Sequence, residues 1–223
     1  MRFVPFFLTF LIPLTAQAEA PRVMASIAPL AGIAAAVMEG VGTPVVLVKG
    51  NASPHTYQLS PSDAAALGQA EMVVWVGAGL ENFLERPLAT LADKAEILEL
   101  LKSDGLETLP TRAGGLWEEE ADGHHEHEHE HDHGAIDPHL WLAPDNAAKI
   151  AALIGEKLAA LDSVHADTYR TNVRRFTERL LVLDGNLTAR LAPVKTRPFI
   201  VFHDAYQYFE HHYGLNGAGA ITL

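Results

Sequence analysis

The amino-acid sequence predicts an α/β fold built on parallel strands. Three observations predict this class: short apolar runs alternate with helix-like segments, glycine follows several of these runs, and a long amphipathic segment lies in the second half. Alternation of this kind favours a parallel sheet covered by helices. The chain has no cysteine, so its 48% hydrophobic residues must build the core without disulfides.

The N-terminus carries the pattern of a secretory signal peptide. Arg2 precedes an apolar run, 4–14, and Ala16-Gln17-Ala18 supplies the small residues of a cleavage site. The run is shorter than the ~20 residues of a membrane span, and no later segment is long and apolar enough to be one. We expect residues 1–18 to be removed, and the mature protein to be exported with no membrane span.

The first half of the mature chain alternates strands and helices. Ser60 with Asp63 resembles a capping box, and Pro61 suits a first helical position. Strands are predicted over 23–28, 45–48, 72–76 and 96–98, and helices over 30–38, 61–69 and from about residue 81.

Composition changes abruptly over 113–134, where Gly, Glu, Asp and His replace apolar residues. Eight carboxylates between Glu118 and Asp132 account for most of the net charge of −12. We expect a surface loop here. The remaining sequence has no basic stripe, which argues against nucleic-acid binding.

The second half is predicted to contain two long helices, 144–161 and 164–191. The second spans roughly 40 Å at 1.5 Å per residue, enough to join two lobes. A strand over 198–202 and a helix over 205–212, stopped by Gly214, follow. One strand and one helix cannot bury a core, so we expect the sequence to be part of a longer protein. The apolar positions expected to form the stripe of the long helix are Val173, Phe176, Leu180, Leu183, Leu187 and Leu191.

Three histidines outside the loop lie near predicted strand ends: His55, His139 and His203. In open α/β sheets, ligands bind at the carboxyl ends of strands, so three distant segments could bring these imidazoles together. Imidazole nitrogen suits Zn²⁺ at ~2.0–2.1 Å, and three ligands leave one tetrahedral position open. Any one histidine taken alone is more often solvated than metal-bound.

The sequence around each histidine resembles a known family. Ser53-Pro54-His55-Thr56-Tyr57, Asp137-Pro138-His139-Leu140-Trp141-Leu142 and Val201-Phe202-His203-Asp204-Ala205-Tyr206 look like the metal-site segments of the periplasmic zinc-binding proteins of bacterial metal ABC transporters. The resemblance covers the mature chain in order. It implies two parallel-sheet lobes joined by a long rigid helix, with the metal between them.

Domain limits follow from this resemblance. We expect an N-terminal lobe over 19–143, a helical region over 144–193 and the start of a C-terminal lobe over 194–223, which leaves the second lobe incomplete. The resemblance places two ligands, His55 and His139, in the first lobe and His203 in the second. Manganese-binding relatives have a carboxylate at the third position, so a histidine there favours zinc.

The fourth ligand is left open by the sequence. Some family members use a glutamate just before the first histidine, where this chain has Pro54. Water, a carboxylate beyond Leu223 or a loop histidine could complete the site.

Six loop histidines alternate mainly with acids and predict weak, reversible zinc sites, in agreement with the resemblance. A merely solvated acidic loop is the alternative. Matches to H-E-x-x-H in this run follow from the repeat and do not indicate a protease. His165, His211 and His212 are expected at the surface. The loop histidines are His124, His125, His127, His129, His131 and His133.

Together with these residues, the resemblance implies a monomeric, non-catalytic receptor that captures Zn²⁺ in the periplasm and delivers it to the permease of an ABC transporter. One alternative is a zinc hydrolase, since three histidines with an open position can activate water. A second alternative is a periplasmic zinc buffer or chaperone that relies on the loop alone.

Overall fold

A computed structural model describes residues 19–112, 117 and 136–222. Four parallel strands form one sheet in the order β2-β1-β3-β4. This arrangement confirms the parallel α/β prediction. The predicted signal peptide and most of the loop lie outside the described residues. The strands are β1 Val23–Ala25, β2 Val45–Val46, β3 Met72–Trp75 and β4 Glu96–Glu99.

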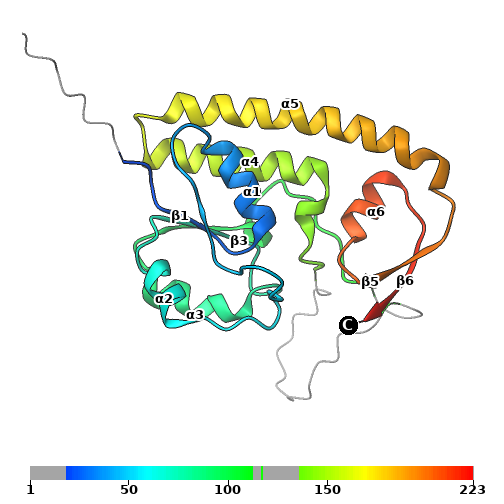
Figure 1. Cartoon of the computed structure of the whole chain (residues 1–223), viewed down its shortest axis with the longest axis horizontal. Helices are drawn as coiled ribbons and strands as arrows, with labels where there is room; N and C mark the ends of the chain where they lie inside the picture. The colour runs from blue at the N-terminus through cyan, green and yellow to red at the C-terminus, as the bar shows by residue number, and fades with distance from the viewer. Residues whose placement is uncertain (1–18, 113–116, 118–135, 223) are drawn as a thin grey trace, which may run out of the picture.

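Helices cover both faces of this sheet (Figure 1). Successive strand residues point to opposite faces of the sheet, so each strand contributes side chains to two hydrophobic cores. Val23 and Ala25 pack with the α1 and α4 side, whereas Met24 packs on the other face. One face carries α1 Ala28–Val37, α4 Pro144–Leu161 and α5 Ala166–Leu191, and the other carries α2 Pro61–Leu67 and α3 Glu85–Leu91.

Local chemistry sets the helix ends. The Ser60–Asp63 capping box is present at α2, and α4 has the predicted bounds. Helix α1 begins two residues earlier than expected, because Pro29 is tolerated in a first turn where no N–H is needed. The helix expected from residue 81 is wrong in its start. Its first turn is a 3₁₀ helix, Asn82–Leu84, since Pro87 would interrupt an α-helix begun at Glu81.

Helix α5 is the longest element, with 26 residues. It packs antiparallel to α4 but is eight residues longer, so its C-terminal end extends past the first lobe. Val173, Phe176 and Leu180 pack against the core, whereas Leu183 is 52% exposed. The predicted apolar stripe is therefore wrong at Leu183, because α4 does not reach that part of α5.

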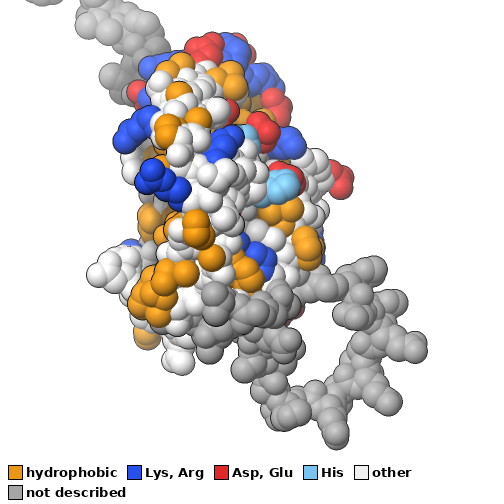
Figure 2. All heavy atoms as spheres, turned by 90° about the vertical axis from the view of Figure 1, so that its right-hand side faces the viewer, with side chains coloured by type: hydrophobic (Ala, Val, Ile, Leu, Met, Phe, Trp, Pro, Cys, Tyr) orange, Lys and Arg blue, Asp and Glu red, His pale blue; other side chains and the backbone are white. Residues whose placement is uncertain are grey.

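Beyond α5 the chain forms a second parallel pair, β5 Phe199–His203 and β6 Gly217–Thr222, linked by α6 Gln207–Tyr213. Gly214 ends α6 with a φ of 63°, a left-handed conformation that favours glycine. Figure 2 faces this end of the molecule and shows hydrophobic side chains on its surface. Ile200 and Ile221 are each 59% exposed. Among the described residues, no helix is both long and apolar enough to cross a bilayer.

Candidate metal centre

The three predicted histidines come together from three separate segments. His55 lies in the connection between β2 and α2, His139 lies at the N-cap of a 3₁₀ turn, Leu140–Leu142, just before α4, and His203 is the last residue of β5. The first two segments border the four-stranded sheet, whereas His203 belongs to the second strand pair. The cluster therefore spans the two parts of the fold.

The geometry of the cluster suits a single small cation. The ring centroids lie 5.8 Å (His55 to His139), 5.6 Å (His55 to His203) and 5.5 Å (His139 to His203) apart. One ring nitrogen from each lies within 4.8 Å of the other two. In a tetrahedral zinc site the ligand nitrogens are about 3.3 Å apart, given bonds of ~2.0–2.1 Å. Small side-chain rotations would bring these imidazoles to that separation.

His139 is oriented by Asp137. The carboxylate Oδ1 accepts the His139 backbone N–H at 2.9 Å and lies 2.8 Å from its Nδ1. Asp137 and His139 are both buried, at 4% and 6% exposure. An Nδ1–H donated to this carboxylate leaves Nε2 as the lone-pair donor for a metal, the usual arrangement behind a metal-bound histidine. Asp137 belongs to the sequence motif around His139, but no local pattern indicates this role.

His55 presents an unsatisfied nitrogen. Its Nε2 is buried and has no hydrogen-bond partner among the described residues. A buried polar atom of this kind calls for a partner. Burial, together with the nearby imidazoles of His139 and His203, lowers the pKa of His55 below its usual value. His55 is therefore neutral near pH 7, the form that binds metal.

The histidines open onto a cavity of about 320 Å³. Its other lining residues in the described chain are apolar, small or aromatic, and include Ile27, Val48 and Trp141 but no aspartate or glutamate. The described part of the chain thus contributes no carboxylate as a fourth ligand. Water, or a donor outside the described residues, remains for that position.

The remaining histidines divide into two groups. The six loop histidines lie outside the described residues. His165 and His212, expected at the surface, are part-buried there, each beside a carboxylate: His165 Nδ1 lies 2.6 Å from Asp162, and His212 Nε2 lies 2.8 Å from Asp184. These carboxylates offset the cost of burying an imidazole. His211 is exposed, as expected.

The fold and the cluster define the class of protein. A parallel α/β lobe and a second strand pair, bridged by a long helix and bringing three histidines together, make a two-lobed metal receptor. A family model described as "Zinc-uptake complex component A periplasmic" matches residues 23–222. The chain belongs to this family, the ZnuA family.

Curated relatives carry the same family name. The "High-affinity zinc uptake system protein ZnuA" of Brucella abortus (strain 2308) is 41% identical over 228 residues, which cover 92% of this chain and 68% of the relative. The protein of that name from Yersinia pestis is 39% identical over 90% of this chain and 65% of its own length. The chain thus spans about two thirds of the length of these relatives.

Solved structures agree with the fold. A zinc-bound ZnuA variant that lacks residues 138–173 of its own sequence superimposes with a TM-score of 0.75 at 28% identity, covering 92% of this chain and 71% of that one. The AdcAII protein of Streptococcus pneumoniae gives a TM-score of 0.71 at 22% identity, covering 92% and 69%. The second likeness supports the fold alone.

Proposed function

We propose that this chain captures Zn²⁺ in the periplasm and delivers it to an ABC-type permease for zinc uptake. The observation that carries the proposal is the convergence of His55, His139 and His203 within 4.8 Å. Membership of the periplasmic zinc-uptake family, and relatives named for high-affinity zinc uptake, support the choice of cargo and route. In this proposal the lobes comprise 19–143 and 194–223, joined by the helical region 144–193.

The donor set favours zinc over harder cations. Three imidazoles supply nitrogen, which suits Zn²⁺, whereas Mg²⁺, Ca²⁺ and Mn²⁺ prefer oxygen. His55 is kept neutral by its surroundings, and Asp137 orients His139. Release to a permease requires the ligands to separate, which is feasible because His203 comes from a different lobe than the other two.

The chain acts without catalysis in this proposal. A zinc hydrolase needs a base or acid beside the metal-bound water, and the described lining of the cavity contains no carboxylate. The carboxylate of Asp137 is already engaged by His139. The loop histidines, His124 to His133, are proposed as auxiliary zinc sites of lower affinity.

Calorimetric titration of metal-free protein with zinc tests the proposal. We expect one tight site and a weaker class. Changing His139→Ala should abolish the tight site, whereas deleting residues 118–133 should remove only the weaker class. Retention of tight binding after His139→Ala, or its loss after the deletion, would show that the primary site is elsewhere. A zinc buffer that relies on the loop alone would give both of these results.

A further inference from the structure

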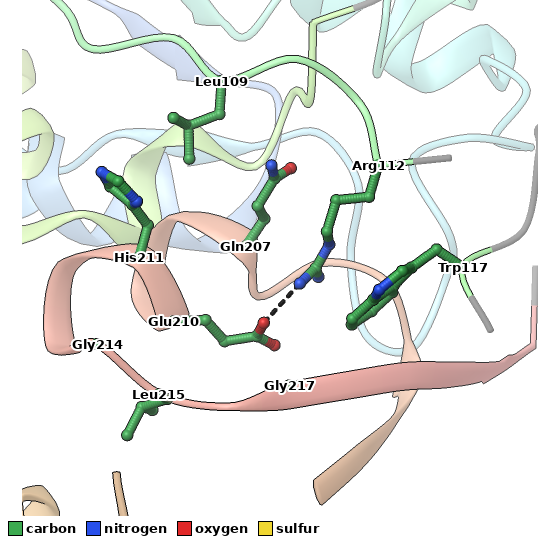
Figure 3. Close-up of a pocket in the computed structure, with 9 residues that line it drawn as sticks. All are labelled: Leu109, Arg112, Trp117, Gln207, Glu210, His211, Gly214, Leu215 and Gly217. Carbon is green, nitrogen blue, oxygen red and sulfur yellow. Dashed lines mark hydrogen bonds and ion pairs between the residues drawn. The ribbon is translucent and has the colours of Figure 1, made fainter. Parts of the chain in front are cut away.

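Arg112 connects the two lobes beside the histidine cluster. Its side chain is 16% exposed. The guanidinium donates two hydrogen bonds to Asp204, one of them from Nε to Oδ2 at 3.3 Å, and a third from Nη1 to Glu210 at 2.5 Å. Figure 3 shows Arg112 reaching Glu210 from a loop of the first lobe. We call these bonds of Arg112 to Asp204 and Glu210 the clamp. Asp204 directly follows His203, so the clamp holds the backbone next to a proposed zinc ligand.

Among the described residues, β5 gains little from apolar packing. None of its five residues is buried, and its alternate residues, including Ile200, are exposed. A strand in a two-stranded sheet with no buried residue gains little from apolar burial. Polar connections to the first lobe therefore contribute to the position of His203.

Two further features make Arg112 a specific connection. Glu210 is buried, and its carboxylate fills the space that a side chain at Gly217 would need, so Arg112 is linked to both α6 and β6. On the other side, the ring of Trp117 stacks on the guanidinium at 3.5 Å from the ring centroid. A planar guanidinium held on a ring and bonded to two carboxylates has a fixed orientation.

A second, uncharged connection lies beside the first. The buried Tyr208 hydroxyl accepts the Leu109 N–H at 2.9 Å and donates to the Asp137 carbonyl at 2.8 Å. Tyr208 thereby anchors α6 to the segment that carries His139. Without Arg112, α6 would stay attached through Tyr208, whereas Asp204 would lose its ion pair with the first lobe.

We propose that Arg112 is a positioning residue that holds His203 within reach of His55 and His139 before the metal arrives. This inference rests on the proposed role of His203 as a zinc ligand. If only a fraction of the protein holds His203 in the position that binds zinc, the apparent zinc affinity is reduced by that fraction. Holding His203 in place therefore raises the affinity.

The sign of the effect separates positioning from charge. Arg112 is a cation near a cation site, so removing it while leaving Asp204 and Glu210 in place would strengthen zinc binding if charge alone mattered. Positioning predicts the opposite, a weaker site.

The first experiment measures zinc affinity by competition with a chelator. Arg112→Met should bind zinc about tenfold more weakly, and Arg112→Lys should recover part of the loss, since lysine restores the charge but not the forked geometry. The control is Arg175→Met, which removes a surface arginine 3.6 Å from Glu39 and should change nothing. Unchanged or tighter binding by Arg112→Met overturns the proposal.

The second experiment needs no zinc. Amide hydrogen exchange of the metal-free protein should be faster over 199–206 in Arg112→Met than in the unchanged chain, with the first sheet unaffected. Equal exchange over 199–206 overturns the proposal. Should Arg112→Met fold poorly because Glu210 is left unpaired, the double variant Arg112→Met with Glu210→Gln replaces it in both experiments.

The two readouts also separate this inference from the proposed function. If the unchanged protein lacked a tight zinc site that depends on His139, the proposed function would fail, whereas exchange over 199–206 would still report whether Arg112 holds that segment.

Discussion

At the scale of single residues, the histidine cluster depends on neighbouring side chains that do not themselves bind the metal. Asp137 lies two residues before His139 and binds both its backbone N–H and its ring. A carboxylate behind a metal-binding histidine fixes the tautomer and raises the basicity of the ligating nitrogen. Asp137 should therefore influence zinc affinity although it does not line the cavity.

We predict that Asp137→Asn weakens zinc binding by about 10- to 100-fold, the usual cost of losing such a partner. The substitution keeps the size of the side chain but removes the negative charge of the group that accepts a hydrogen bond from the His139 ring. Chelator competition measures the change. Asp145→Asn, at an exposed position in the first turn of α4, is the control and should bind zinc normally; equal affinities for both variants would exclude this role for Asp137.

At the scale of elements, α4 and α5 approach closely at a glycine. A Cβ at Gly155 would lie 2.5 Å from Cγ2 of Val173, inside contact distance. Gly185, in the C-terminal half of α5, has nothing within 4 Å of the same position. The two glycines therefore have different effects. Gly155 permits close packing of α4 on α5, whereas Gly185 only lowers the helix propensity of α5.

We predict opposite signs for the two alanine substitutions. Gly155→Ala should destabilise the protein by about 1–3 kcal/mol through overpacking, whereas Gly185→Ala should stabilise it by up to about 1 kcal/mol through helix propensity. Urea denaturation measures both. In a Val173→Ala background the steric clash is gone, so Gly155→Ala should no longer destabilise; a persistent loss there would mean that the clash is not the cause.

The junction between α4 and α5 is closed by Asp162. Burial disfavours its carboxylate, but hydrogen bonds from His165 and Tyr169 outweigh this effect and hold the pKa of Asp162 below its usual value. A depressed carboxyl pKa contributes stability that is present above the unfolded-state value and is lost as pH falls through the folded-state value.

We predict that Asp162→Asn lowers the free energy of unfolding by about 1–3 kcal/mol at neutral pH, because buried groups lose a charged partner. The difference from the unchanged protein should begin to narrow below about pH 4, the pKa of an unfolded-state aspartate, and should narrow further as pH falls through the lower folded-state pKa of Asp162. Urea denaturation across this range measures it, with the fully exposed Asp167→Asn as control. A difference in the free energy of unfolding that stayed constant with pH would contradict an ionised Asp162.

At the scale of the whole molecule, the cluster joins His203 of the second strand pair to His55 and His139 of the first lobe. A ligand that binds only the folded form stabilises it by an amount set by its concentration relative to Kd. Zinc held by His55, His139 and His203 would act as a connection between the lobes in addition to Arg112 and Tyr208.

We predict that zinc at about a thousand times its Kd stabilises the protein by about 4 kcal/mol, and that a chelator reverses this gain. Thermal denaturation with and without zinc measures it. His203→Ala should lose most of the gain, whereas His211→Ala, at an exposed position, should keep it. Equal stabilisation of both variants would place the metal elsewhere.

Much of the fold could be predicted from the sequence because its signals are local. The capping box at Ser60, the bounds of α4 and the αL stop at Gly214 each depend on residues within one turn. The errors arose where distant parts intervene. Leu183 belongs to the apolar period of α5 but is exposed, because α4 does not extend to cover it. His212 is part-buried against Asp184, 28 positions earlier in the chain, a pairing that no sequence pattern indicates.

The sequence by itself determined the class of fold, the family and the three candidate ligands, since each histidine carries its motif within a few neighbouring residues. Only the tertiary structure decided what surrounds them. The convergence of the three histidines within 4.8 Å and the ion pairs of Arg112 with Asp204 and Glu210 join residues across the fold. Contacts between segments roughly a hundred positions apart depend on how the helices and sheets pack, which no local pattern specifies.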